Sequence, residues 1–170
     1  MPERKLLVSD LTLEYEGLFD CADLFRLIDD WFKQNGYDKN EIKHIEKVRE
    51  KGKFIDYEIA PFKKVSDYAQ YDIDVRVLVN NMTNADVTKN KQKLQLNKGK
   101  VTIIFNALLV TDVSERWESK PFFFFLRVLF DKFIHKRYIE QYDKGLMTDV
   151  QNLHTELKGY LNLSRHTQGS

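Results

Sequence analysis

An alternation of apolar and polar residues over Tyr71–Val79 restricts the fold of this chain more than any other feature. The apolar positions are Tyr71, Ile73, Val75, Val77 and Val79, and the residues between them include Asp72, Asp74 and Arg76. Successive side chains of a strand point to opposite faces, so the pattern predicts a strand with one buried and one solvated face. An antiparallel sheet covered on one side has this alternation.

Shorter runs extend the predicted sheet. We expect further strands over Lys5–Glu16, Ile55–Ile59, Lys89–Leu96 and Val101–Val110, with Gly17 ending the first. Residues 40–53 fit a helix or an exposed strand, and the strands that follow favour a strand. Pro61 places the end of its strand at an edge or a bulge. We expect turns at Asn80-Asn81 and at residues 97–100, the second closing a hairpin.

Helical spacing occurs at two places. Asp20 is a predicted N-cap, an amphipathic helix follows, and Asn35-Gly36 ends it. After Asp112 the period changes again: a helix is expected over Phe122–Gln141, an interruption or bend at Asp143–Gly145, and a second helical pattern over Leu146–Leu161. The order of elements predicts an α+β class, with residues 1–163 as one domain and 164–170 as a disordered tail.

Composition excludes several classes of protein. The 170 residues carry 27 Lys and Arg against 26 Asp and Glu, a formal charge of +1, so bulk electrostatics do not favour nucleic acid as a partner. The one cysteine, Cys21, can form no intramolecular disulfide and belongs to no zinc motif, and we expect it to be buried and inert. No metal or other cofactor is expected. Residues 1–5 precede no apolar leader and no run is long enough to span a membrane, so we expect a soluble, cytoplasmic protein.

The order of strand, helix, several antiparallel strands and long C-terminal helices resembles the helix-grip superfamily of START, polyketide-cyclase-like and Bet v 1-like proteins. This resemblance covers roughly Leu11–Leu161 and depends on element order alone. Where Bet v 1-like members carry an early glycine-rich loop, this chain has only Lys51-Gly52-Lys53. The resemblance implies a curved antiparallel sheet packed around a long C-terminal helix, often with an apolar cavity between them.

Aromatic residues are concentrated in one segment. Five of the 12 Phe residues lie between Phe122 and Phe130, and the helix expected there is apolar over more than the single stripe that packing on a sheet requires. The second surface can be covered by the Leu146–Leu161 segment of the same chain, by a homodimer or other protein partner, or by a ligand. A membrane is less favoured, because the polar strip is thin and not strongly basic.

The leading functional hypothesis is non-catalytic binding of an apolar or amphipathic, lipid-like small molecule in a cavity between sheet and helix. It follows from the resemblance and from the excess of aromatic surface. The alternative is an interaction or assembly protein that uses its aromatic helix. The candidate ligand-binding residues are Tyr57, Tyr71, Ile73, Val75, Phe105, Trp117, Phe125 and Leu129.

Two other groups of residues could have a function, but for each of them we favour a purely structural role. Arg127, Asp131 and His135 follow one another at steps of four and could serve a cyclase- or hydrolase-like enzyme, although such a line is commonly a solvated helix edge. We therefore lean away from an enzyme. Lys89, Lys91 and Lys93 alternate onto one expected strand face, where they could attract phosphate, lipid headgroups or RNA, or protect a sheet edge from aggregation.

Overall fold

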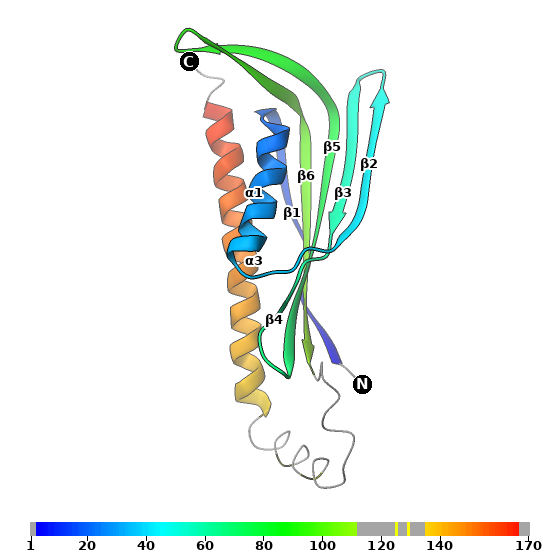
Figure 1. Cartoon of the computed structure of the whole chain (residues 1–170), viewed down its shortest axis with the longest axis vertical. Coiled ribbons are helices and arrows are strands. Elements are labelled where there is room, and N and C mark those ends of the chain that lie inside the picture. Colours follow the sequence, from blue (N-terminus) through cyan, green and yellow to red (C-terminus); the bar gives the residue numbers. More distant parts are fainter. Residues whose placement is uncertain (1–2, 112–124, 126–128, 130–134, 167–170) are drawn as a thin grey trace.

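A computed structural model describes residues 3–111, 125, 129 and 135–166. Most of the described chain belongs to a few long elements, shown in Figure 1, which confirm the α+β class. In chain order they are β1 (Glu3–Phe19), α1 (Cys21–Gln34), β2 (Glu41–Arg49), β3 (Gly52–Ile59), β4 (Phe62–Lys64), β5 (Ala69–Lys89), β6 (Gln92–Thr111) and α3 (His135–His166).

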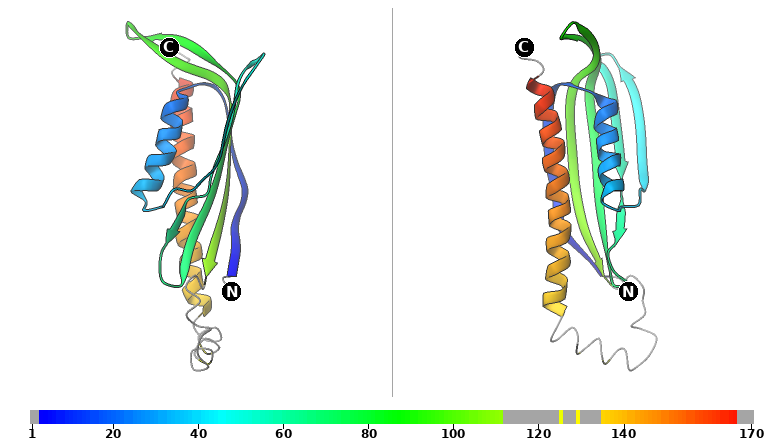
Figure 2. Two further views of the ribbon diagram at one scale, coloured as in Figure 1. Left: turned by 45° about the vertical axis from the view of Figure 1, so that its right-hand side comes forward. Right: turned by 60° about the vertical axis from the view of Figure 1, so that its left-hand side comes forward.

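The strands form one antiparallel sheet in the order β1-β6-β5-β3-β2, with β4 pairing separately with β5. The sheet is curved and not closed. Both α1 and α3 lie side by side on the same face of it, as the two views of Figure 2 show. A curved antiparallel sheet with a long C-terminal helix on one face is compatible with a helix-grip arrangement.

The expected first helix is confirmed together with its cap. The Asp20 side chain accepts a hydrogen bond of 3.0 Å from the backbone N–H of Asp23, as an N-cap does, and α1 ends at Asn35 and Gly36. Gly17, by contrast, does not end β1. It pairs with Gly99 inside the sheet, and the strand continues to Phe19 before α1 begins. Residues 41–49 form a strand, as the strands that follow indicated.

The largest correction concerns the middle of the sheet, where two expected turns are absent. Instead of the three short strands expected over residues 71–110, β5 and β6 pair along almost their whole length, and the chain reverses at Asn90-Lys91. Asn81 takes a positive φ of 54° at a shift of register, so its turn-like conformation makes a bulge. Gly99 lies in β6, where a Cβ would stand 2.9 Å from the Asn80 carbonyl oxygen, which explains a glycine inside a strand.

The C-terminal helix also differs from the expected one. Gly145 neither ends nor bends it in the described part of the chain, and α3 runs continuously from His135 to His166, into the first residues of the expected tail. The side chains that face the sheet are Leu146, Val150, Leu153, Leu157 and Leu161, all buried. The helix held by the sheet is therefore the leucine-patterned one, whereas most of the aromatic segment lies outside the described residues.

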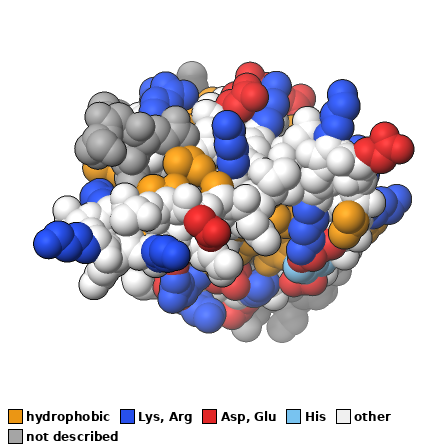
Figure 3. Space-filling model, turned by 90° about the horizontal axis from the view of Figure 1, so that it is seen from above, with side chains coloured by type: hydrophobic (Ala, Val, Ile, Leu, Met, Phe, Trp, Pro, Cys, Tyr) orange, Lys and Arg blue, Asp and Glu red, His pale blue; other side chains and the backbone are white. Residues whose placement is uncertain are grey.

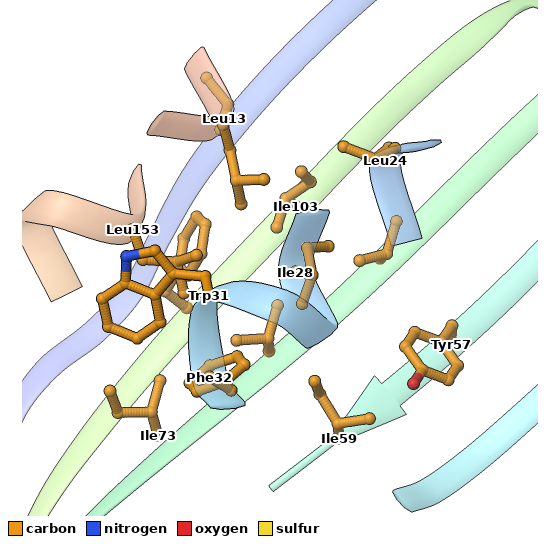
Figure 4. Packing of buried hydrophobic residues seen from close by; sticks show 14 of the residues in the cluster. Leu13, Leu24, Ile28, Trp31, Phe32, Tyr57, Ile59, Ile73, Ile103 and Leu153 are labelled. Atoms are coloured by element: carbon orange, nitrogen blue, oxygen red, sulfur yellow. The ribbon is translucent and has the colours of Figure 1, made fainter. Parts of the chain in front are cut away.

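Side chains from both helices and from the inner face of the sheet form one core (Figure 4). From α1 come Leu24, Ile28, Trp31 and Phe32, and the sheet contributes the alternating residues that the sequence predicted, including Ile73, Val75 and Val77. Each of these strand residues is fully buried because it points toward the helices. Among the described residues no helix combines the length and the apolar character needed to cross a membrane.

Candidate functional site

Five of the eight residues predicted to bind a ligand come together in the core. Tyr57, Tyr71, Ile73, Val75 and Phe105 all lie on the inner face of β3, β5 and β6 and are buried in the same cluster. Val75 pairs with Phe105 across the sheet, and the Tyr57 ring contacts that of Phe25 edge-on at 5.0 Å between centroids. Two neighbours of Tyr57 lie outside the core: the His44 ring at 5.2 Å between centroids and the Lys39 ammonium at 5.8 Å from the ring centroid.

The other three do not join this group. Phe125 and Leu129 are helical and stand four residues apart, with 60% and 40% of their surface exposed. Trp117 lies outside the described residues. Exposed side chains do not line an enclosed cavity, so the structure separates the two helical residues from the five in the core.

A polar cluster lies where α3 crosses the sheet. The Tyr37 hydroxyl donates a hydrogen bond of 2.7 Å to Asp149, and burial, followed by this hydrogen bond, raises the pKa of Tyr37. Burial, together with the carboxylate of Asp149, raises the pKa of Tyr71 to about 12. The Tyr71 hydroxyl lies directly against Gly145, where a Cβ would overlap it. Both phenols therefore stay protonated at neutral pH and serve to dock α3.

One hollow lined by described residues is a groove between the two helices, not between helix and sheet. We call it the α1–α3 groove. It has a volume of about 750 Å³ and is lined by Leu27, Trp31, Asn152, Thr155, Glu156, Gly159, Tyr160 and Leu163. Leucine and aromatic side chains form its walls and Asn152, Thr155 and Glu156 supply polar groups, as in sites for small amphipathic molecules. Gly159 faces open space, since a Cβ there would meet no atom within 4 Å.

A second hollow lies beneath the end of the long hairpin. The pairing of β1 with β6 ends where Phe19 faces Asn97. Past that point β5 and β6 pair only with each other, and residues 84–96 form a two-stranded ribbon that curls over the ends of α1 and α3 (Figures 1 and 2). The ribbon hollow beneath it has a volume of about 320 Å³. It is lined by Phe19, Asp20, Asp23, Lys89, Leu94, Leu96, Tyr160 and Ser164.

The ribbon carries the lysines that the sequence singled out, in a different arrangement from the expected one. Lys89 ends β5, Lys91 lies in the turn and Lys93 belongs to β6, so they surround a tip instead of alternating along one strand. In the view from above, Lys and Arg side chains stand at the projecting end, and hydrophobic side chains reach the surface between polar ones (Figure 3).

The described residues contain little that resembles catalytic machinery. Burial raises the pKa of the Cys21 thiol to about 11, as expected for an inert cysteine. No group of three or more His, Cys, Asp or Glu in the described part of the chain can hold a metal ion. Arg127 and Asp131, with the side chain of His135, lie outside the described residues, so the enzymatic hypothesis stays a prediction.

A charged cluster on the opposite face of the sheet surrounds the buried Asp56. Asp56 accepts two hydrogen bonds from the Arg76 guanidinium, at 2.9 and 3.0 Å, and one of 2.5 Å from Lys43. Arg76 first, and Lys43 after it, lower the pKa of Asp56 to about 2. Because Asp56 pairs with Lys43 on one side and Arg76 on the other, the cluster ties β2, β3 and β5 together.

The sequence did not indicate the groove. On α3 the groove is lined by Thr155, Gly159 and Leu163, which follow one another at steps of four. This pattern is weaker than the leucine pattern of Leu146–Leu161 in the same helix, so it was not recognised in the sequence. A glycine inside a helix, where it costs about 1 kcal/mol relative to alanine, was the available signal.

No protein-family model, no curated protein and no solved structure matches this chain.

Proposed function

We propose that this protein binds an apolar or amphipathic small molecule without transforming it, and that the α1–α3 groove is the binding site. The groove carries the proposal: Leu27, Trp31, Tyr160 and Leu163 give it apolar walls that are open to solvent. This places the ligand on the outside of the helix layer and not in the sheet–helix cavity that the resemblance implied. The proposal includes membership of the helix-grip superfamily and a cytoplasmic location.

Filling the groove tests this function. Gly159→Leu adds a large side chain where the structure leaves open space, and leucine favours a helix more than glycine does. Asn162→Leu adds the same side chain to an exposed position of α3 that does not line the groove. Native mass spectrometry and lipid extraction of the purified protein, followed by calorimetric titration with dodecanol and dodecanoate, measure the binding.

We expect Gly159→Leu to lose binding of both amphiphiles while keeping its thermal stability, and Asn162→Leu to bind as the wild-type protein does. If the wild-type protein takes up neither molecule and carries no lipid, or if Gly159→Leu binds unchanged, the groove is not a ligand site.

Assembly through the aromatic segment is the second candidate function. Phe125 and Leu129 favour it because two large apolar side chains one helical turn apart are exposed. A protein partner or second copy of the chain would remove them from water. Light scattering of the wild-type protein and of the double variant Phe125→Ser/Leu129→Ser tests self-association: a dimer that the double variant abolishes supports it. A wild-type monomer at high concentration removes the homodimer.

A further inference from the structure

The two edges of the sheet differ in how well they are protected. β1 forms one edge, where its pairing with β6 shifts register twice between Leu6 and Leu11 and Asp10 takes a positive φ of 53°. Bulges of this kind twist an edge and disfavour pairing with another chain. β2 forms the other edge, pairs only with β3 among the described strands, and keeps one register from Lys43 to Arg49. Its outer backbone groups are therefore a regular template for a further strand.

Apolar side chains on this edge are exposed to solvent. Val48 is 89% exposed and Ile42 is 56% exposed, and no described element lies beyond β2 in the ribbon views (Figures 1 and 2). Charged side chains commonly keep an edge strand from pairing, and β2 does carry lysine, arginine and glutamate. Whether those charges repel or attract a second strand depends on which residues the pairing places opposite each other.

A second copy of β2 is a strand whose pattern fits this edge. Directly opposite residues of an antiparallel pair point to the same face, so their numbers differ by an even number when two copies are related by a two-fold axis. One residue must then lie opposite itself. With Ile45 in that place, His44 of each copy lies opposite Glu46 of the other, and Ile42 lies opposite Val48. The exposed apolar side chains are thus paired with each other, and each imidazole is paired with a carboxylate.

The neighbouring registers are less favourable. Centring the pair on Glu46 puts two carboxylates directly opposite each other, which is destabilising. Centring it on His44 sets the two histidines against each other and places Ile42 opposite Glu46. Of these three registers, only the one centred on Ile45 combines apolar pairs with pairs of complementary polarity.

One like-charge pair, Lys43 with Lys47, is present in the Ile45 register. The Lys43 ammonium lies 2.5 Å from the Asp56 carboxylate of β3, so it points into its own sheet and away from the free edge. At the ends of the strand, Glu41 of each copy comes near Arg49 of the other, which has the opposite charge. The charges of β2 therefore permit this pairing and select its register.

We propose that β2 is a self-association edge, at which two copies of this chain pair antiparallel about a two-fold axis at Ile45. The two sheets then form one, with the helices of both copies on the same face. The proposal depends neither on ligand binding in the α1–α3 groove nor on the aromatic segment. Because the axis repeats every contact, one substitution changes two cross-strand pairs, which together alter the dissociation constant about 2- to 30-fold.

Sedimentation equilibrium of the full chain over a range of concentrations tests self-association. Val48→Lys puts a cation opposite Ile42 and, because Val48 is so exposed, should leave the fold of the single copy intact. Leu6→Lys is the matched control, since it makes the same kind of change at an exposed apolar residue of the β1 edge. We expect a reversible wild-type dimer that Val48→Lys weakens within the range given above and that Leu6→Lys leaves unchanged.

A disulfide cross-link tests the register, in a Cys21→Ala background. Ile45→Cys brings two thiols opposite each other at a Cα separation of about 4.5–5.5 Å, which a disulfide accepts. Lys47→Cys is the control on the same face, because its two copies stand roughly 13 Å apart along the strands. Oxidation should cross-link the Ile45→Cys protein and not the Lys47→Cys protein.

The opposite results overturn the proposal. A wild-type protein that stays monomeric at high concentration removes it and leaves the ligand site of the groove unaffected. A dimer that Val48→Lys does not weaken also removes it, and loss of that dimer in Phe125→Ser/Leu129→Ser would assign self-association to the aromatic segment. Equal cross-linking at residues 45 and 47 would refute the register centred on Ile45.

Discussion

Two glycines of α3 should respond in opposite directions to the same substitution. Replacing a helix-interior glycine by alanine stabilises a helix by about 0.5–1 kcal/mol, because alanine loses less backbone entropy on folding. At Gly159 the new methyl group meets no atom within 4 Å, so Gly159→Ala should gain this amount. At Gly145 the methyl group would overlap the hydroxyl oxygen of Tyr71, whose ring is buried. Overpacking of this kind costs about 1–3 kcal/mol, which exceeds the gain.

Chemical denaturation followed by circular dichroism measures the free energies of unfolding, and Tyr71→Phe completes the test. Removal of the hydroxyl leaves the ring carbon Cζ as the nearest atom, at an acceptable 3.4 Å from the new methyl group. The double variant Gly145→Ala/Tyr71→Phe should therefore recover most of the stability that Gly145→Ala loses, with a coupling of about 1 kcal/mol or more. Equal stability of the two alanine variants, or no recovery in the double variant, would refute the close docking of α3 on β5.

Three further predictions concern the sheet and its hairpin. Asp56→Asn should remove about 2 kcal/mol from the free energy of unfolding at neutral pH. The pKa of Asp56 is about 2 in the folded protein and near 4 in the unfolded chain. Its contribution to stability is therefore present above pH 4 and is lost as the pH falls toward 2. Unfolding at pH 7 and pH 3 should show a smaller acid-induced loss in the variant. Asp74→Asn should instead stabilise the protein at pH 7, since burial and then Asp72 and Glu58 raise the pKa of Asp74, and a variant less stable than wild type contradicts this. Lys91→Gly should raise the free energy of unfolding by about 0.5–1 kcal/mol, because Asn90 and Lys91 both have positive φ in the hairpin turn. A lower free energy of unfolding would contradict the turn geometry.

Local patterns predicted most of the inner face of the sheet. The alternation over Tyr71–Val79 identified five buried residues of β5, although not Ala69 or Met82, and Asp20 identified the start of α1, because each signal involves only residues near in sequence. The turns predicted from Asn81 and Gly99 were wrong for the same reason, because those signals are local too. Asparagine and glycine serve turns and bulges alike, and only the pairing of β5 with β6 on both sides of them decides between the two.

The candidate site could not be predicted in this way. The α1–α3 groove joins Trp31 to Gly159, and the ribbon hollow joins Asp20 to Lys89, so each depends on segments brought together by folding. By itself the sequence determined the α+β class, the faces of the strands and the leucine stripe that packs on the sheet, since periodicity is a local property. Only the tertiary structure decided which helix the sheet holds and that the ribbon curls over the helix ends, because those depend on the packing of distant elements against one another.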